Sequence, residues 1–568
     1  MSQSATVGAG GVTAVHAARL FNASCIALIC GAAMFAVTGE IAGALKREFV
    51  LSNEEVGLLL GWPGWGFTLG LFALGPLCDV IGMGRVLRLA LVFHAAGILL
   101  MVFANGFWML FAGFLVNALG SGAVEAACNP LIATIYPDKK THKLNQFHMW
   151  FPGGIVIGGA ACWLMTQADT AWWPKALSNL SAMAGMGLWQ LKLAILLVPV
   201  AIYGVMFTGR RFPPTERVAA GVSFGGMFKE TLFRPLFLAL LFAMMLTASL
   251  ELGPNRWIPA VLEAGGIPGI LVLVWITGLM AVLRFAAGPV VKWFGSNSLL
   301  LLVSAVVAGA GLTALSFATN VYIAGAAATV FALGVCYFWP TMLGTVAERV
   351  PKGGALALAL IGGVGGLFVN GATIPIMGWT ADRYLHQELV FKGTVDGRPV
   401  DRQAETVAAL RGVQSSYAAW DAFLGTSPQD EVAKAEIRAV LAEAGKVLAA
   451  FDESRGLPET ATANALRIAV KNGPAAAPAE RIESLPGGQA RPQTVAEMRA
   501  DMRLRTEDQA FRAKSRAEAI LNPADNKGGL MSFRWVAPVS IILVGVFGAM
   551  YLQDRRSAGR PPQPPPNP

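Results

Sequence analysis

The residues best suited to chemistry in this sequence are ionisable side chains set within long apolar stretches. Glu40 and Glu125 lie inside two such stretches, and Glu251 lies near the end of a third. A charged side chain at the centre of a membrane costs roughly 2.5–3.5 kcal/mol on insertion scales. Desolvation favours the neutral carboxyl, so such a group can exchange protons near neutral pH. We therefore expect Glu125 and Glu40 to couple proton movement to another process.

The composition predicts a protein that spans a membrane many times. Of the 568 residues, 55% are hydrophobic and 14% are charged, whereas soluble domains carry about 25% charged residues. The charges are concentrated between residues 381 and 530, and the rest of the chain has too few to be well solvated. The formal net charge of +9 comes from basic residues in short links. This pattern indicates membrane orientation rather than binding to nucleic acid.

Twelve apolar stretches are long enough to cross about 30 Å of hydrocarbon as helices. They lie at 18–45, 54–80, 86–104, 107–136, 147–167, 188–208, 233–262, 268–292, 298–317, 320–344, 354–380 and 533–552. Basic residues are concentrated in alternate links, which places both termini in the cytoplasm and residues 381–532 outside. We expect the protein to reside in the lipid bilayer of a bacterial cytoplasmic (inner) membrane.

The expected fold is an all-α membrane protein whose twelve helices form two six-helix halves related by pseudo-symmetry. Gly75-Pro76 after the second stretch is echoed by Gly288-Pro289 after the eighth, and Asn129-Pro130 in the fourth by Trp339-Pro340 in the tenth. The predicted parts are a disordered cytoplasmic N-terminus (1–17), an N-terminal half (18–208), a cytoplasmic linker (209–232), helices 7–11 (233–380), an extracytoplasmic helical insert (381–532), helix 12 (533–552) and a disordered Pro-rich cytoplasmic tail (553–568).

The insert is expected to be helical and accessory to the membrane-spanning part. Ser427-Pro428-Gln429-Asp430 predicts the start of one helix, with Pro at its first position. Thr494-Val495-Ala496-Glu497 predicts the start of a second, highly charged helix that ends near Ile520. The segment 472–492 between them is rich in Pro, Ala and Gly and predicts a loose link.

Three stretches of sequence are similar to motifs of a known family. The first is Gly75-Pro76-Leu77-Cys78-Asp79-Val80-Ile81-Gly82-Met83-Gly84-Arg85. The second is Glu125-Ala126-Ala127-Cys128-Asn129-Pro130 with the following Lys143-Leu144-Asn145-Gln146-Phe147-His148, and the third runs from Glu251 through Trp257 to Pro259. The first resembles the loop motif of the major facilitator superfamily. The other two resemble the fucose permease-like proton:sugar symporters within that superfamily.

This resemblance implies proton-linked transport of a small, sugar-like solute. It places Glu125 in a central cavity, and Glu40 matches the spacing of an acid in the first span. Phe151 stands where the family has a cavity Asn, which is a departure from a fucose-specific site. Val80 replaces a basic residue of the loop motif, so the latch formed by Asp79 is expected to be weaker.

The candidate site residues fall into two groups. Those expected to contact the solute, as polar groups or as aromatic faces for sugar rings, are Glu125, Glu40, Asn129, His148, Trp62, Trp65, Glu251 and Asn370. Those expected to act in gating or structure are Asp79, Gly75, Gly82, Arg85, Arg284, Glu348 and Arg349. For each residue, a purely structural role in helix packing is the alternative.

Other chemistries have no support in the sequence. No phosphate loop, dinucleotide fingerprint, metal cluster or hydrolytic triad stands out, and the six cysteines all lie in apolar stretches. We therefore expect no cofactor, no metal and no enzymatic activity. Two alternatives stay open. One is a carrier of organic acids or drug-like compounds, with possible export, in which Arg256 and Arg284 would bind anions; the other is a membrane scaffold or sensor whose insert docks a partner protein.

Overall fold

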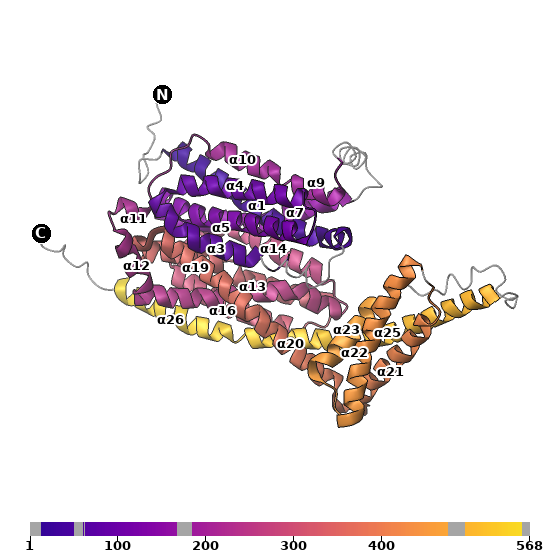
Figure 1. Ribbon diagram of the computed structural model, residues 1–568. Coiled ribbons are helices and arrows are strands. Elements are labelled where there is room, and N and C mark those ends of the chain that lie inside the picture. The colour runs from indigo at the N-terminus through magenta and orange to yellow at the C-terminus, as the bar shows by residue number, and fades with distance from the viewer. Residues whose placement is uncertain are drawn as a thin grey trace, which may run out of the picture.

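The computed structural model describes residues 13–49, 59, 61, 63–166, 185–425, 427–474 and 495–558, and helices dominate it (Figure 1). Several predicted features lie wholly or largely outside these ranges. They are the N-terminal tail up to residue 12, the start of the second predicted span, the link 475–492 and the Pro-rich end beyond residue 558.

The first half of the bundle consists of helices that follow the apolar stretches closely. These are α1 (Ala14–Glu48), α3 (Pro63–Val80), α4 (Met83–Val102), α5 (Phe107–Ile135), α7 (Trp150–Thr166) and the adjoining α9 (Leu188–Ala194) and α10 (Leu197–Phe207). The turn η1 (Pro137–Lys139) and helix α6 (Lys140–His148) join α5 to α7, and α11 (Glu216–Ala219) and α12 (Phe224–Leu232) occupy the link to the second half.

The second half repeats this plan with more interruptions. Its elements are α13 (Pro235–Ala264), α14 (Gly269–Phe285), α15 (Ala287–Phe294), α16 (Asn297–Leu315), α17 (Val321–Val335), α18 (Phe338–Arg349), η2 (Pro351–Gly353), α19 (Gly354–Phe368), η3 (Val369–Thr373), α20 (Ile374–Leu389) and α26 (Val539–Ala558). One large apolar cluster runs through both halves.

Within the described ranges, nine helices are long and apolar enough to cross a membrane, or ten if one bent pair counts as a single span. The predicted number of twelve stays a prediction. The bent pair is α14 and α15, which meet at 69° where the sequence predicted one span over 268–292. A Cβ on Gly288 would lie 2.6 Å from the His142 ring, so α15 is seated directly against α6. Packing between helices therefore overrides the apolar periodicity here.

The helices between α20 and α26 form a second group with its own apolar core, and Figure 1 shows this group projecting from one end of the bundle. It contains an antiparallel hairpin of β1 (Lys392–Val395) and β2 (Arg398–Asp401), followed by α21 (Arg402–Asp421), α22 (Pro428–Ser454), α23 (Glu459–Asn472) and α25 (Val495–Val536). The N-cap of α22 is Ser427, at the predicted position.

Helix α25 is longer than the sequence predicted. It continues through Pro523 to Val536, instead of ending near Ile520, and α26 starts only at Val539. A Cβ on Gly528 would lie 2.3 Å from a backbone oxygen of α20, and one on Gly529 would lie 2.3 Å from a side chain of α13. The C-terminal part of α25 is therefore packed tightly between α20 and α13. The group of helices is thus joined to the second half of the bundle by two continuous rods, α20 and α25 (Figure 1).

Candidate functional site

Glu125 lies inside α5, at the place where the two halves meet. Glu125 is 5% exposed. Its carboxyl lies beside Asn129, one turn further along α5, and beside Trp339 in the second half. Its Oε2 atom is buried and has no hydrogen-bond partner among the described residues. A buried carboxylate oxygen without a partner is costly, so this atom is well placed to bind a proton or a donor group from a ligand.

Two further predicted residues continue the polar chain on the same side. His148 Nε2 lies 3.0 Å from Asn129 Oδ1, and both side chains are buried. His148 is the last residue of α6, so its position depends on the turn η1, which joins α5 to α6. The structure therefore brings Glu125, Asn129 and His148 together.

Arg284 connects this chain to the second half. Its Nη1 donates to the His148 carbonyl at 3.2 Å and its Nη2 to Glu251 Oε1 at 2.9 Å. A third bond runs from its Nε to the Cys336 carbonyl. The Arg284 and Glu251 side chains are only 3% and 4% exposed. The sequence predicted Glu251 near the end of its apolar stretch, but it lies in the interior of α13 (Pro235–Ala264) and is buried.

Trp339 is a member of this cluster that the sequence did not single out as a site residue. Its indole lies beside Glu125 and its backbone N–H lies on the side of Glu251, so one residue at the start of α18 is a neighbour of both carboxyls. The available signal was the Trp339-Pro340 pair late in the tenth apolar stretch. The cluster holds two buried carboxyls and one guanidinium, and its charges balance when one carboxyl is protonated.

Other predicted solute contacts lie elsewhere. Glu40 pairs with Lys192 Nζ at 3.0 Å and its side chain is 43% exposed. Trp65 is 45% exposed, and the Asn370 amide donates to Gly366 of the preceding helix, one turn away. These contacts are made with residues other than those of the cluster around Glu125, and Trp62 lies outside the described residues.

Asp79 forms the predicted latch, with partners in the link between the halves. Its Oδ2 lies 3.1 Å from Arg217 Nε, and its Oδ1 accepts from the Thr215 hydroxyl. A Cβ on Gly354, the first residue of α19, would lie 3.1 Å from Asp79 Oδ2, so the carboxylate also lies against the second half. The acid therefore holds together the end of α3, the linker helix α11 and the second half.

The remaining residues of the loop motif act through the backbone. A Cβ on Gly75 would lie 2.2 Å from the Ala359 Cβ, so α3 and α19 touch along this face. Gly82 has φ 89°, a conformation that glycine adopts without strain, and it starts α4. Arg85 Nη1 donates to the Ile81 carbonyl, four residues earlier, at 3.0 Å.

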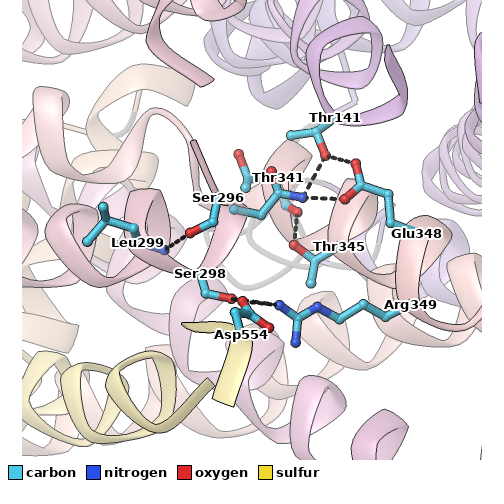
Figure 2. A network of polar contacts seen from close by, with 10 residues as sticks. Thr141, Ser296, Ser298, Leu299, Thr341, Thr345, Glu348, Arg349 and Asp554 are labelled. Carbon is cyan, nitrogen blue, oxygen red and sulfur yellow. Dashed lines mark hydrogen bonds and ion pairs between the residues drawn. The ribbon is translucent and has the colours of Figure 1, made fainter. Parts of the chain in front are cut away.

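Glu348 and Arg349, at the end of α18, make a second set of contacts on this face (Figure 2). Glu348 Oε1 accepts from the Thr141 hydroxyl of α6 at 2.7 Å, and its Oε2 accepts from the Asn297 amide at 2.8 Å. Arg349 Nη2 lies 2.6 Å from Asp554 Oδ2 in α26. Glu348 thus links the two halves, while Arg349 ties helices within the second half.

Within the described ranges, no group of His, Cys, Asp or Glu side chains is arranged to hold a metal ion. The cluster around Glu125 is instead suited to proton binding and to hydrogen bonding with hydroxyl groups.

Comparison with known proteins identifies the family and the fold. The family model described as the Major Facilitator Superfamily matches residues 23–371. The fold is similar to that of the Escherichia coli fucose:proton symporter, with a TM-score of 0.51, 18% identity and coverage of 63% of this chain and 92% of that one. It is also similar to a bacterial homologue of the human lysosomal transporter Spinster, with a TM-score of 0.54, 14% identity and coverage of 95% and 99%.

Curated relatives match over shorter segments. A gallate transporter of Pseudomonas putida is 27% identical over 34% of this chain and 42% of its own length. A hexose transporter of Saccharomyces cerevisiae is 26% identical over 22% of this chain and 23% of its own length. The chain therefore spans less than half the length of either of these relatives.

Proposed function

The chain belongs to the Major Facilitator Superfamily, and from that premise we propose that it is a secondary active carrier, which takes up a small, sugar-like solute together with protons by alternating access. The proposed location is a bacterial cytoplasmic membrane, with both termini in the cytoplasm. Hexose and D-xylose transporters among its relatives support a sugar-like cargo.

The observation that carries this proposal is the setting of Glu125. Its carboxyl is buried between the halves, has one oxygen with no hydrogen-bond partner among the described residues, and lies beside Trp339 of the second half. Gain or loss of a proton there changes the charge balance of a cluster that both halves share. Protonation of Glu125 can therefore be coupled to the relative position of the halves. Glu40 is already neutralised by Lys192, so the proposal assigns coupling to Glu125.

Contacts at one face of the bundle supply the gate. Asp79 with Arg217, and Glu348 with Thr141, join the two halves on the side that carries the linker. We assign this side to the cytoplasm because its links are basic. These bonds must break for the solute to leave inward, so they hold the inner gate closed in the conformation described.

The test is solute uptake into proteoliposomes that contain the purified protein, with an inward proton gradient. One proton moved across 100 mV supplies about 2.3 kcal/mol, enough for roughly 50-fold accumulation of a neutral solute. Glu125→Gln should abolish gradient-driven accumulation. Exchange of labelled for unlabelled solute should persist in this variant, because exchange needs no net proton movement.

Glu40→Gln is the matched control, since it neutralises an acid that is paired away from the cluster. It should retain gradient-driven accumulation. The proposal fails if the wild type shows no proton-dependent uptake of any sugar or hydroxylated acid. The role of Glu125 fails if Glu125→Gln accumulates solute as the wild type does.

A further inference from the structure

Arg256 is a basic residue within a membrane-spanning helix of the second half. It lies in α13, five residues beyond Glu251, and its side chain is exposed. In the part of the chain that the structure describes, no carboxylate forms an ion pair with it. Arg284 and Arg217, in contrast, pair with acids at 2.9 and 3.1 Å.

The one contact of Arg256 that the structure records is with an aromatic ring of the other half. Its guanidinium carbon lies 5.8 Å from the centre of the Phe35 ring, and Phe35 is itself 51% exposed. Because α1 and α13 belong to opposite halves, Arg256 faces the seam between them. A group bound there touches both halves, as the cargo of an alternating-access carrier must.

A guanidinium within a membrane-spanning helix is costly unless an opposite charge or water compensates it. A contact with an aromatic face compensates it only in part. Arginine is also the side chain whose planar fork matches a carboxylate with two parallel hydrogen bonds. The missing counter-ion can therefore be supplied by the solute.

We propose that Arg256 binds a carboxylate of the cargo, so that the preferred solute is a hydroxylated carboxylic acid, such as a sugar acid, and not a neutral sugar. This inference rests on the proposed transport function and narrows its substrate class. Residues 251 and 256 are about 7.5 Å apart along the helix axis and about 140° apart around it, so the carboxylate site at Arg256 lies on a different side of α13 from Glu251.

The names of the curated relatives are consistent with such a cargo. Gallate and gentisate transporters and hexose and xylose transporters all match segments of this chain. A hydroxylated carboxylic acid shares its acid group with gallate and gentisate, and its array of hydroxyl groups with hexoses and xylose. The exposed ring of Phe35 offers an apolar face to the carbon skeleton of either kind of molecule.

The experiment compares D-galacturonate, gallate and D-galactose as ligands and as cargo. Ligand binding is followed through the thermal stabilisation of the detergent-purified protein, and uptake is measured in proteoliposomes. The wild type should bind at least one of the two acids more tightly than galactose. Arg256→Gln should weaken binding of that acid by about tenfold or more, because a hydrogen-bonded charge pair is lost. The affinity of Arg256→Lys for that acid should lie between those of the wild type and Arg256→Gln, since lysine keeps the positive charge but lacks the planar fork of the guanidinium.

Arg383→Gln is the matched control. The Arg383 guanidinium also lies over an aromatic ring, 5.5 Å from Trp379 in α20, and it is exposed. This variant should bind and transport like the wild type. A second measurement needs no variant at Arg256: phenylglyoxal modification of arginines in the wild type, read by mass spectrometry. The preferred acid should slow modification of Arg256 and leave that of Arg383 unchanged.

The outcomes separate this inference from the proposed function. If the wild type takes up galactose with protons and prefers it to both acids, the carboxylate site is refuted while proton-coupled sugar uptake stands. If Arg256→Gln binds the acid as tightly as the wild type, or if the acid does not protect Arg256, the site is likewise refuted. If no compound enters with protons, the proposed function itself is overturned.

Discussion

The buried ion pair between Arg284 and Glu251, which joins α13 to α14 within the second half, allows a quantitative test of how charge compensation stabilises the cluster. The two atoms lie 2.9 Å apart and both side chains are almost fully buried. Glu251→Gln keeps the size of the side chain and removes its charge. Arg284 keeps two carbonyl acceptors, at His148 and Cys336, but loses its paired carboxylate.

Removal of one partner from a buried ion pair leaves an uncompensated charge and costs about 3–5 kcal/mol. We therefore expect Glu251→Gln to lower the free energy of unfolding by about that amount. Arg284→Met should cost as much, because it strands the carboxylate instead. The double variant carries neither charge, so its loss should be clearly smaller than the sum of the two single losses.

The assay is denaturant unfolding of the protein in detergent micelles, followed by tryptophan fluorescence, for the wild type, both single variants and the double variant. Asp452→Asn is the control, since Asp452 pairs with Arg411 at 3.0 Å but both side chains are 56% exposed. An exposed pair contributes about 1 kcal/mol or less. If Glu251→Gln costs no more than Asp452→Asn, or if the single losses simply add in the double variant, charge compensation does not dominate this cluster.

Three further predictions concern helix contacts, acid stability and the group of helices between α20 and α26. Gly75→Val should push α3 away from α19 and open the face that carries the linker. Gly39→Val should not do so, because nothing lies within 4 Å of a Cβ on Gly39. Distances between spin labels placed on the two halves measure this opening. The Ser427 hydroxyl is the main cause that holds the pKa of Asp430 below its usual value. The ionised Asp430 carboxylate therefore stabilises these helices fully above the unfolded pKa of about 3.9, and this stabilisation is lost as pH falls through the lower folded pKa. Pepsin cleavage of these helices should rise over that pH range. Asp430→Asn should remove this part of the pH dependence. Deletion of residues 390–525 should leave uptake intact in a carrier, whereas complete loss of function in a variant that still folds would favour a scaffold or sensor.

The helices and part of the site could be predicted because they depend on residues close together in the chain. Apolar runs without breakers gave the positions of most helices, and the N-cap at Ser427 followed from its local sequence. Glu125 and Asn129 are one turn apart on a single helix, so their proximity is a property of the helix itself. His148 lies after the turn that follows this helix, and its Nε2 atom contacts Asn129 Oδ1.

The partners of charged side chains could not be predicted in the same way. Arg284 pairs with Glu251 from 33 positions earlier, and Glu40 pairs with Lys192 from 152 positions later. Periodicity indicates which side of a helix faces inward, but it does not say which neighbouring helix that side meets, or at what height. For this reason the sequence grouped Glu40 with Glu125, whereas packing placed it beside Lys192 and left it half-exposed.

The same physical limit explains the two elements whose boundaries differed. At the bend between α14 and α15, Gly288 packs against α6, and the extended end of α25 packs against α13 and α20. The sequence by itself determined a charge-poor chain of apolar helices with a carboxyl at the centre of one of them. The tertiary structure alone decided that this carboxyl meets Trp339 and the Arg284 pair across the seam, because that contact exists only when the two halves are packed together.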